Sequence, residues 1–248
     1  MTGRPTDDRA DAPVDGTVDG TGHDTARTGA AVAGVVERVF ATVHELQDAA
    51  LRSLGATDLP GPRLDEQVRA LLGAPGQLAV GLGLVASSAG RVRLEWWQVD
   101  PDAGHLLGLD PDLDPGSVGY YDVTATDWFA VPRSTGRRHV VGPYVDVHGT
   151  GRYLLTFTTP VVVAGEFAGV VGADVPVDRF ESHLLELLGP VREPVVLLDG
   201  DRRVVLSTAA RWLVGDLVPA ADHPAGPGVD VAGVPWRLHA VPGDGAAA

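Results

Sequence analysis

One ten-residue stretch of the chain concentrates side chains that could bind a small molecule. It reads YYDVTATDWF, at positions 120–129, and it contains four aromatic and two acidic residues. Aromatic residues make up only 6% of the chain, so this density is a local feature. Aromatic faces attract cations, and carboxylates pair with them. The stretch therefore indicates a site for a positively charged group.

The overall composition favours the same kind of ligand. The formal net charge of the 248 residues is −14, which repels phosphate backbones and anionic lipid headgroups. We therefore expect no binding to nucleic acid or to a membrane surface, whereas a cationic or zwitterionic small molecule suits this field. Cysteine is absent, which excludes a thiol nucleophile, disulfides and cysteine-ligated metals. All 19 cationic residues are arginine, so a Schiff-base lysine is excluded too.

The N-terminal third of the chain predicts a tail and two helices. Residues 1–29 are rich in Asp, Thr, Gly and Pro, and we expect a disordered acidic tail there. From 30 to 54, apolar residues recur at steps of three and four, which predicts one long amphipathic helix. A second, short helix is predicted over residues 64–72, before Pro75 and Gly76.

The remainder of the chain is rich in strand signals. Hairpins are predicted to turn at Ala164-Gly165 and at Asp199-Gly200. Between them, a helix is predicted over residues 179–188, with Asp178 and Glu181 as its capping box. The β-rich runs are QLAVGLGLVAS, RVRLEWWQVD, GRYLLTFTTPVVVAGEFAGVVGADV, PVVLLDGDRRVVLST and GVPWRLHAV.

These elements predict an α+β protein with two antiparallel-sheet modules behind a long N-terminal helix. We divide the chain into a tail at 1–29, the two helices at 30–75, a first module at 76–178, a linking helix at 179–189, a small second module at 190–242 and a tail at 243–248.

Three phrases in this order carry a family resemblance. They are DWF at 127–129, VGPYVD at 141–146 and FTTPVVVAGEFAGVVGADVPVDRF at 157–180. Together they resemble the double Cache (dCache) sensor domain, the PAS-like ligand-binding domain of chemoreceptors and sensor kinases. The resemblance is strongest over residues 118–180, and the order of elements from 30 to about 241 agrees with it. It implies two PAS-like modules, of which the first binds a small ligand between its sheet and covering loops.

The resemblance also implies which residues form the site. In amino-acid-binding members a Tyr, an Arg five positions later, a Trp, a Tyr and a distant Asp contact the ligand. Here Tyr121, Trp128 and Asp174 match, whereas Thr126 stands at the Arg position and Phe129 at the final aromatic position. An arginine would pair with a ligand carboxylate through two parallel hydrogen bonds. Without it, the half of the site that holds an ammonium group remains, so we expect an amine or another cationic metabolite.

The expected ligand-binding set has an ordinary structural alternative at several positions. Phe129 could simply seal the core, Thr126 could cap a short helix that ends before Pro132, and Asp146 could be a turn residue. Of the adjacent Trp96 and Trp97, which point to opposite faces of a strand, one could line the pocket. The set comprises Tyr121, Trp128, Tyr144, Asp146, Asp174, Thr126 and Phe129.

A substitute for the missing arginine would have to come from elsewhere in the chain. The candidates near the expected pocket in sequence are Arg133, Arg137, Arg138 and Arg152.

No catalytic arrangement is recognisable in the sequence. The eight histidines include no pair at helical metal-binding spacing, and no serine stands in a nucleophile motif. We expect no enzyme activity, no metal and no cofactor. Two alternatives stay open, namely an enzyme that acts on a small amine in the same pocket and an interaction module with a vestigial pocket.

The sequence also predicts where the protein is located and how it passes on a signal. No secretory signal and no apolar run of membrane-spanning length are visible, which predicts a soluble, cytoplasmic protein. With no output domain of its own, it would signal by contact with a separate transcriptional regulator or kinase. The resemblance implies that the long N-terminal helix could mediate a homodimer.

Overall fold

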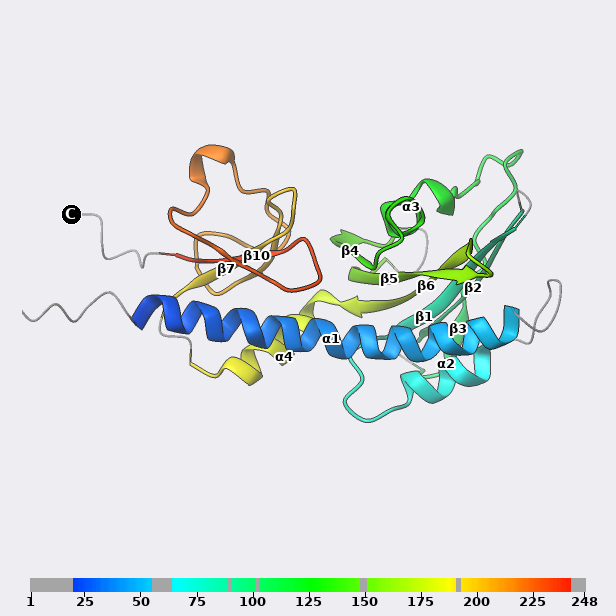
Figure 1. Cartoon of the computed structure of the whole chain (residues 1–248), viewed down its shortest axis with the longest axis horizontal. Coiled ribbons are helices and arrows are strands. Elements are labelled where there is room, and N and C mark those ends of the chain that lie inside the picture. The colour runs from blue at the N-terminus through cyan, green and yellow to red at the C-terminus, as the bar shows by residue number, and fades with distance from the viewer. Residues whose placement is uncertain are drawn as a thin grey trace, which may run out of the picture.

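The computed structural model describes residues 20–54, 64–88, 91–100, 103–147, 151–190 and 193–241. Helix α1 runs along one side of the molecule and passes beneath two separate sheets (Figure 1). The expected α+β fold, with a long N-terminal helix and two antiparallel sheets, is confirmed. Within the described ranges, no helix has the length and apolar character needed to cross a membrane.

Helix α1 spans Gly20–Leu54 and begins ten residues earlier than the apolar pattern predicts. The expectation of a disordered tail is therefore wrong for residues 20–29, and residues 1–19 lie outside the described residues. The early turns pack against the second module: Thr25 and Thr28 are buried, and a Cβ on Gly29 would lie 3.1 Å from Cγ1 of Val229. Tertiary packing thus extends a helix whose sequence alone is weakly apolar.

The first sheet has six strands in the order β3-β2-β1-β6-β5-β4. Ala164 and Gly165 both have positive φ, of 53° and 86°, and connect β5 to β6, which confirms the predicted hairpin. The strands are β1 (Gly81–Ser88), β2 (Arg91–Val99), β3 (Leu106–Gly108), β4 (His139–Val145), β5 (Tyr153–Val163) and β6 (Glu166–Pro176).

The second sheet has four strands in the order β8-β7-β10-β9. The predicted hairpin at Asp199-Gly200 is present, and Oδ1 of Asp199 organises its turn by accepting from the backbone N–H groups of Asp201 and Arg203. The strands are β7 (Val195–Leu198), β8 (Val204–Ser207), β9 (Val229–Asp230) and β10 (Arg237–Ala240).

The remaining helices are short. Helix α2 spans Asp65–Leu72, close to its predicted range, and two 3-10 turns lie at Val123–Ala125 (η1) and Ala220–Asp222 (η2). Helix α3 spans Asp127–Thr135, so it continues through Pro132 rather than ending before it, and Gly136 with φ of 65° terminates it.

Helix α4 spans Val177–Leu188, and its N-cap is Pro176. The predicted capping box is therefore wrong, because Asp178 lies inside the first turn.

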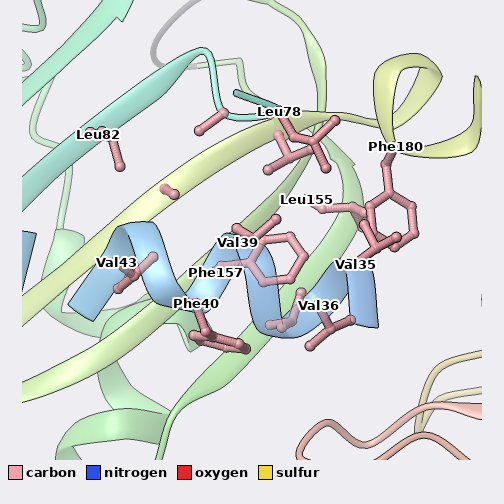
Figure 2. Packing of buried hydrophobic residues seen from close by; sticks show 14 of the residues in the cluster. Val35, Val36, Val39, Phe40, Val43, Leu78, Leu82, Leu155, Phe157 and Phe180 are labelled. Atoms are coloured by element: carbon pink, nitrogen blue, oxygen red, sulfur yellow. The ribbon is translucent and has the colours of Figure 1, made fainter. Parts of the chain in front are cut away.

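The main core lies between α1 and one face of both sheets. Apolar residues at helical spacing on α1, such as Val35, Val39 and Phe40, point towards strand and α4 residues such as Phe157 and Phe180 (Figure 2). A second, smaller apolar cluster lies on the opposite face of the first sheet, where α3 packs (Figure 1). That opposite face, which α1 does not cover, holds the candidate site.

Candidate functional site

A cavity lies on the first sheet, beneath the segment that leads from β3 through η1 into α3. It encloses about 440 Å³ of space, including the solvent at its mouth. The lining residues are Leu94, Trp96, Leu109, Pro111, Tyr121, Trp128, Tyr144, Asp146, Thr156 and Asp174.

Asp174, near the end of β6, is the most enclosed charged residue of this cavity, with 4% of its surface exposed. Its Oδ2 accepts hydrogen bonds from Nε1 of Trp96 at 2.7 Å and from Nε2 of Gln98 at 2.9 Å. Its Oδ1 accepts from Oγ1 of Thr156 at 2.7 Å. Three donors from two other strands therefore fix the carboxylate, and carboxylate oxygens have lone pairs for a further donor.

The environment of Asp174 makes it a weaker acid than usual. Burial raises the pKa of its carboxyl group from 3.8 to about 6, and the nearby Asp146 carboxylate acts in the same direction. The hydrogen bonds from Thr156, Trp96 and Gln98 oppose this rise. At neutral pH the group is mostly ionised, and a ligand cation would relieve the unfavourable burial of its charge.

Tyr144 reaches the same carboxylate through a hydroxyl chain. Its phenol group lies 2.9 Å from Oγ1 of Thr156, and because Thr156 donates its own proton to Asp174, Tyr144 donates to Thr156. Burial raises the pKa of Tyr144, so at physiological pH its phenol is neutral and keeps the proton that it donates to Thr156. Burial also raises the pKa of Tyr121. Both tyrosines therefore add polar but uncharged surface to the cavity.

The aromatic walls come from the sheet and from α3. The ring centroids of Trp96 and Trp128 lie 5.7 Å apart, with their planes tilted by 51°. Tyr121 lies on the segment before η1 and is half-buried. A cation held by Asp174 would thus have indole and phenol rings close to it, an arrangement that stabilises organic ammonium groups.

Two glycines make room for Trp96 on the sheet. A Cβ on Gly83 of β1 would lie 2.6 Å from the Trp96 ring, and one on Gly172 of β6 would lie 2.9 Å from it. The indole therefore lies flat across two neighbouring strands and reaches Asp174. The GLG phrase at 81–83, which has strand rather than loop structure, owes its composition to this close approach.

The structure gathers five of the seven expected site residues around the cavity: Tyr121, Trp128, Tyr144, Asp146 and Asp174. The other two do not line it. Thr126 occupies the N-cap position of α3, and its hydroxyl group donates to the carbonyl of Val123 at 2.6 Å. Phe129 is fully buried in the smaller apolar cluster, where its ring contacts that of Phe167 edge to face.

The sequence left open which of Trp96 and Trp97 lines the cavity, and it missed several other lining residues. Trp96, rather than Trp97, faces the cavity, and Trp97 packs against the main core instead. Leu94 and Trp96 lie two positions apart on β2, so their side chains point to the same face of the sheet. Once that face is known to line the cavity, both residues are expected there. Leu109, Pro111 and Thr156 are also lining residues, and no local signal distinguished them.

None of the four arginines considered as substitutes lines the cavity. Arg138 forms a two-pronged ion pair with Glu37 and lies over the ring of Phe40, and Arg152 donates to the carbonyl of Val99. Among the described residues, the lining thus contains two carboxylates and no cationic side chain. Nor do the described residues contain a cluster of three or more His, Cys, Asp or Glu suited to a metal ion.

Solved structures of sensory domains have a similar fold. A structure described as methyl-accepting chemotaxis protein X matches with a TM-score of 0.65 and 15% sequence identity, over 89% of this chain and 95% of that one. The ligand-binding domain of the Pseudomonas aeruginosa PAO1 chemoreceptor PctC, in complex with GABA, matches with a TM-score of 0.56 and 19% identity, over 88% and 96%. The corresponding domain of PctB, in complex with L-Arg, matches with a TM-score of 0.57 and 17% sequence identity, over 88% of this chain and 91% of that one.

These matches are structural only, because no protein-family model and no curated protein matches the chain in sequence. They span most of both chains, so they include the long helix and both sheets rather than one module. The chain therefore has the fold of chemoreceptor ligand-binding domains of the double Cache type.

Proposed function

We propose that this chain is a small-molecule sensor domain whose first module binds an organic amine. The observation that carries the proposal is the buried Asp174 carboxylate, held by three donors at the base of an aromatic cavity. A buried carboxylate is costly unless a cation or hydrogen bonds compensate its charge. An ammonium group is the ligand that fits both this carboxylate and the surrounding rings.

The structural relatives support the class of ligand. GABA and L-Arg, the molecules in the PctC and PctB complexes, both carry an amino group and a carboxylate. In this chain the lining offers carboxylates to an amino group but, among the described residues, no guanidinium to a carboxylate. The proposed ligand is therefore an amine without a carboxylate beside the amino group, rather than a standard α-amino acid.

The two alternatives differ from this proposal in what happens to the ligand. An enzyme would convert the amine, and a vestigial module would not bind it. The apolar rings and the single hydroxyl chain from Tyr144 through Thr156 offer a binding surface, and we assign no bond-breaking step to them. A cytoplasmic location and signalling by contact with a separate regulator or kinase remain predictions.

The test is a thermal-shift experiment on the purified chain with matched pairs of compounds. Phenethylamine would be compared with phenylalanine, and putrescine with ornithine, so that each pair differs by one carboxylate. A ligand at about one hundred times its dissociation constant adds roughly 2.7 kcal/mol to the free energy of unfolding, a readily measured shift. We expect amines to stabilise the protein more than the matched amino acids.

Two variants make the result specific to the cavity. Asp174→Asn removes the charge and should abolish the shift, whereas Asp178→Asn, at an exposed position in the first turn of α4, should preserve it. Stronger stabilisation by the amino acids would contradict the amine assignment. Conversion of the amine, followed by mass spectrometry, would favour the enzyme alternative, and no shift with any compound would favour the vestigial module.

A further inference from the structure

The second module contains a cavity of its own, on the face of its sheet that α1 does not cover. Leu238 of β10 belongs to the main core, so its neighbour His239 points to the opposite face. The β7–β8 turn and the segment from η2 to the start of β10 contribute the rest of the lining. The cavity encloses about 790 Å³, including the solvent at its mouth.

His239 is a buried polar residue of this cavity whose ring nitrogens are left without partners by the described part of the fold. The residue is 3% exposed, and neither ring nitrogen has a hydrogen-bond partner among the described residues. A buried polar group without a partner costs about 1–3 kcal/mol. Such a group in a native core is unusual, and its position in the wall of a cavity suggests that a bound molecule supplies the partner.

The charges around His239 indicate what that molecule carries. Asp230 pairs with Arg237 at 3.4 Å, and Oδ1 of Asp199 accepts hydrogen bonds from the backbone N–H groups of Asp201 and Arg203. Arg202 also lines the cavity, and no carboxylate within 4.0 Å of its guanidinium group is found among the described residues. The unmatched groups are therefore one guanidinium and one imidazole, and both can donate hydrogen bonds to an anion.

The rest of the lining favours an organic anion over a bare inorganic one. Leu198, Val234 and Pro235 contribute apolar lining beside the polar groups, and so does the edge of Trp236, whose ring otherwise packs in the main core. Apolar surface of this kind is stabilised by contact with a hydrocarbon body. We propose that the second module binds a small organic carboxylate, with its carboxylate group between Arg202 and His239.

His223 is the residue that such a ligand must move. Its exposed ring packs edge to face on that of His239, with the centroids 4.8 Å apart, and covers it from solvent. One ring nitrogen of His223, Nδ1, lies 3.2 Å from the carbonyl of Pro224. A rotation of this surface side chain would expose more of the His239 ring to the cavity without disturbing the sheet.

Protonation provides a readout that a structural role of His239 would not give. Burial lowers the pKa of His239, and the neighbouring His223 and Arg237 lower it further, against the opposing effect of Asp230. A carboxylate bound beside the ring would favour the protonated form, since both nitrogens then donate. Ligand binding should therefore raise the pKa of His239.

The experiment is a titration of the full chain, with ¹³C-labelled histidine, by benzoate and butyrate. Changes in the His223 and His239 ring resonances would be followed by NMR, with His223→Gln and His239→Gln used for assignment. We expect benzoate to shift both resonances and to raise the pKa of His239. Arg202→Gln should weaken benzoate binding by about tenfold or more, the effect expected for loss of a charge-assisted hydrogen bond. Arg211→Gln, an exposed arginine of the same module outside the cavity, should leave binding unchanged.

Several outcomes would overturn the proposal. Unchanged histidine resonances at millimolar benzoate and butyrate would exclude a carboxylate site. Equal binding of inorganic phosphate, or a response to Zn²⁺ alone, would replace the organic carboxylate with another ligand. Binding that survives Arg202→Gln would place the carboxylate elsewhere.

This proposal is independent of the amine site in the first module. Asp174→Asn should leave the benzoate response intact, and Arg202→Gln should leave the amine response intact. Either site can therefore fail its test without affecting the other.

Discussion

Trp96 and Asp174 are 78 residues apart in the chain and are joined by a hydrogen bond of 2.7 Å. They lie on β2 and β6, which are not neighbours, because β1 runs between them. The indole crosses β1 at Gly83, and the carboxylate approaches β1 at Gly81, where a Cβ would lie 2.8 Å from Oδ2. The candidate amine site thus depends on two glycines whose contribution is the absence of a side chain.

Substitution of Gly83 by alanine should displace Trp96 and so break its bond to Asp174. The added Cβ would lie 2.6 Å from the indole and 2.5 Å from the carbonyl oxygen of Glu95. Overpacking of this kind costs about 1–3 kcal/mol. We expect the variant to unfold at lower denaturant concentration and to lose its thermal response to amines.

Gly34→Ala is the matched control for this substitution. Gly34 is exposed on α1, and no atom lies within 4 Å of the position of its added Cβ. Alanine in a helix interior is favoured over glycine by about 0.5–1 kcal/mol, so this variant should be slightly more stable and should bind amines normally. Normal amine binding by Gly83→Ala would refute the supporting role of the glycine.

Amine affinity should depend on pH through Asp174. Only the ionised carboxylate pairs with an ammonium group, and burial places its pKa at about 6. Below this value the affinity should fall about tenfold for each pH unit, and above it the affinity should level off. Isothermal titration with phenethylamine between pH 5 and 8 measures the profile. A flat profile across this range would show that Asp174 is not the partner of the ammonium group.

The stability of the unliganded protein should show the opposite trend. The pKa of Asp174 is raised from 3.8 to about 6 in the folded state, so between these values the folded protein binds more protons than the unfolded chain. The contribution of this group to the free energy of unfolding therefore falls as pH rises through that interval, by about 3 kcal/mol at most. Urea unfolding of the wild type and of Asp174→Asn, each at pH 4 and pH 7, measures the contribution of this group to the free energy of unfolding. The variant should gain stability relative to the wild type at the higher pH, and an equal difference at both values would contradict the burial of an ionised group.

Thr156→Val should shift the pH profile itself. The Thr156 hydroxyl donates to Asp174 and receives a hydrogen bond from Tyr144, so its removal leaves two buried groups without this partner. Such a loss costs about 1–3 kcal/mol of stability. Because the Thr156 hydrogen bond lowers the pKa of Asp174, its loss should move the midpoint of amine binding to higher pH.

Thr158→Val, two residues further along β5, is the control for that shift. The hydroxyl group of Thr158 is also buried, but it donates to the carbonyl of His139 at 3.4 Å and makes no contact with Asp174. Its removal should lower stability without moving the midpoint. If both variants moved the midpoint equally, the effect would come from general loosening of the strand.

The sequence by itself determined the elements and most of the candidate residues. Apolar residues at steps of three and four predict the long helix, and the Ala164-Gly165 turn predicts the β5–β6 hairpin, since these signals are local. The resemblance pointed to Asp174, and the structure places that residue at the cavity with Tyr121 and Trp128. Local spacing is enough for such predictions, because the spacing of apolar residues indicates which face of a helix or strand is buried.

Tertiary structure alone decided what covers each face. Adjacent tryptophans in a strand must point to opposite faces, but only the packing of α1 on one face and α3 on the other directs Trp96 into the cavity and Trp97 into the main core. The start of α1 at Gly20, ten residues before its apolar pattern, likewise depends on the second module. These arrangements require contacts between segments far apart in the chain, and residue spacing along one segment contains no information about its distant partner.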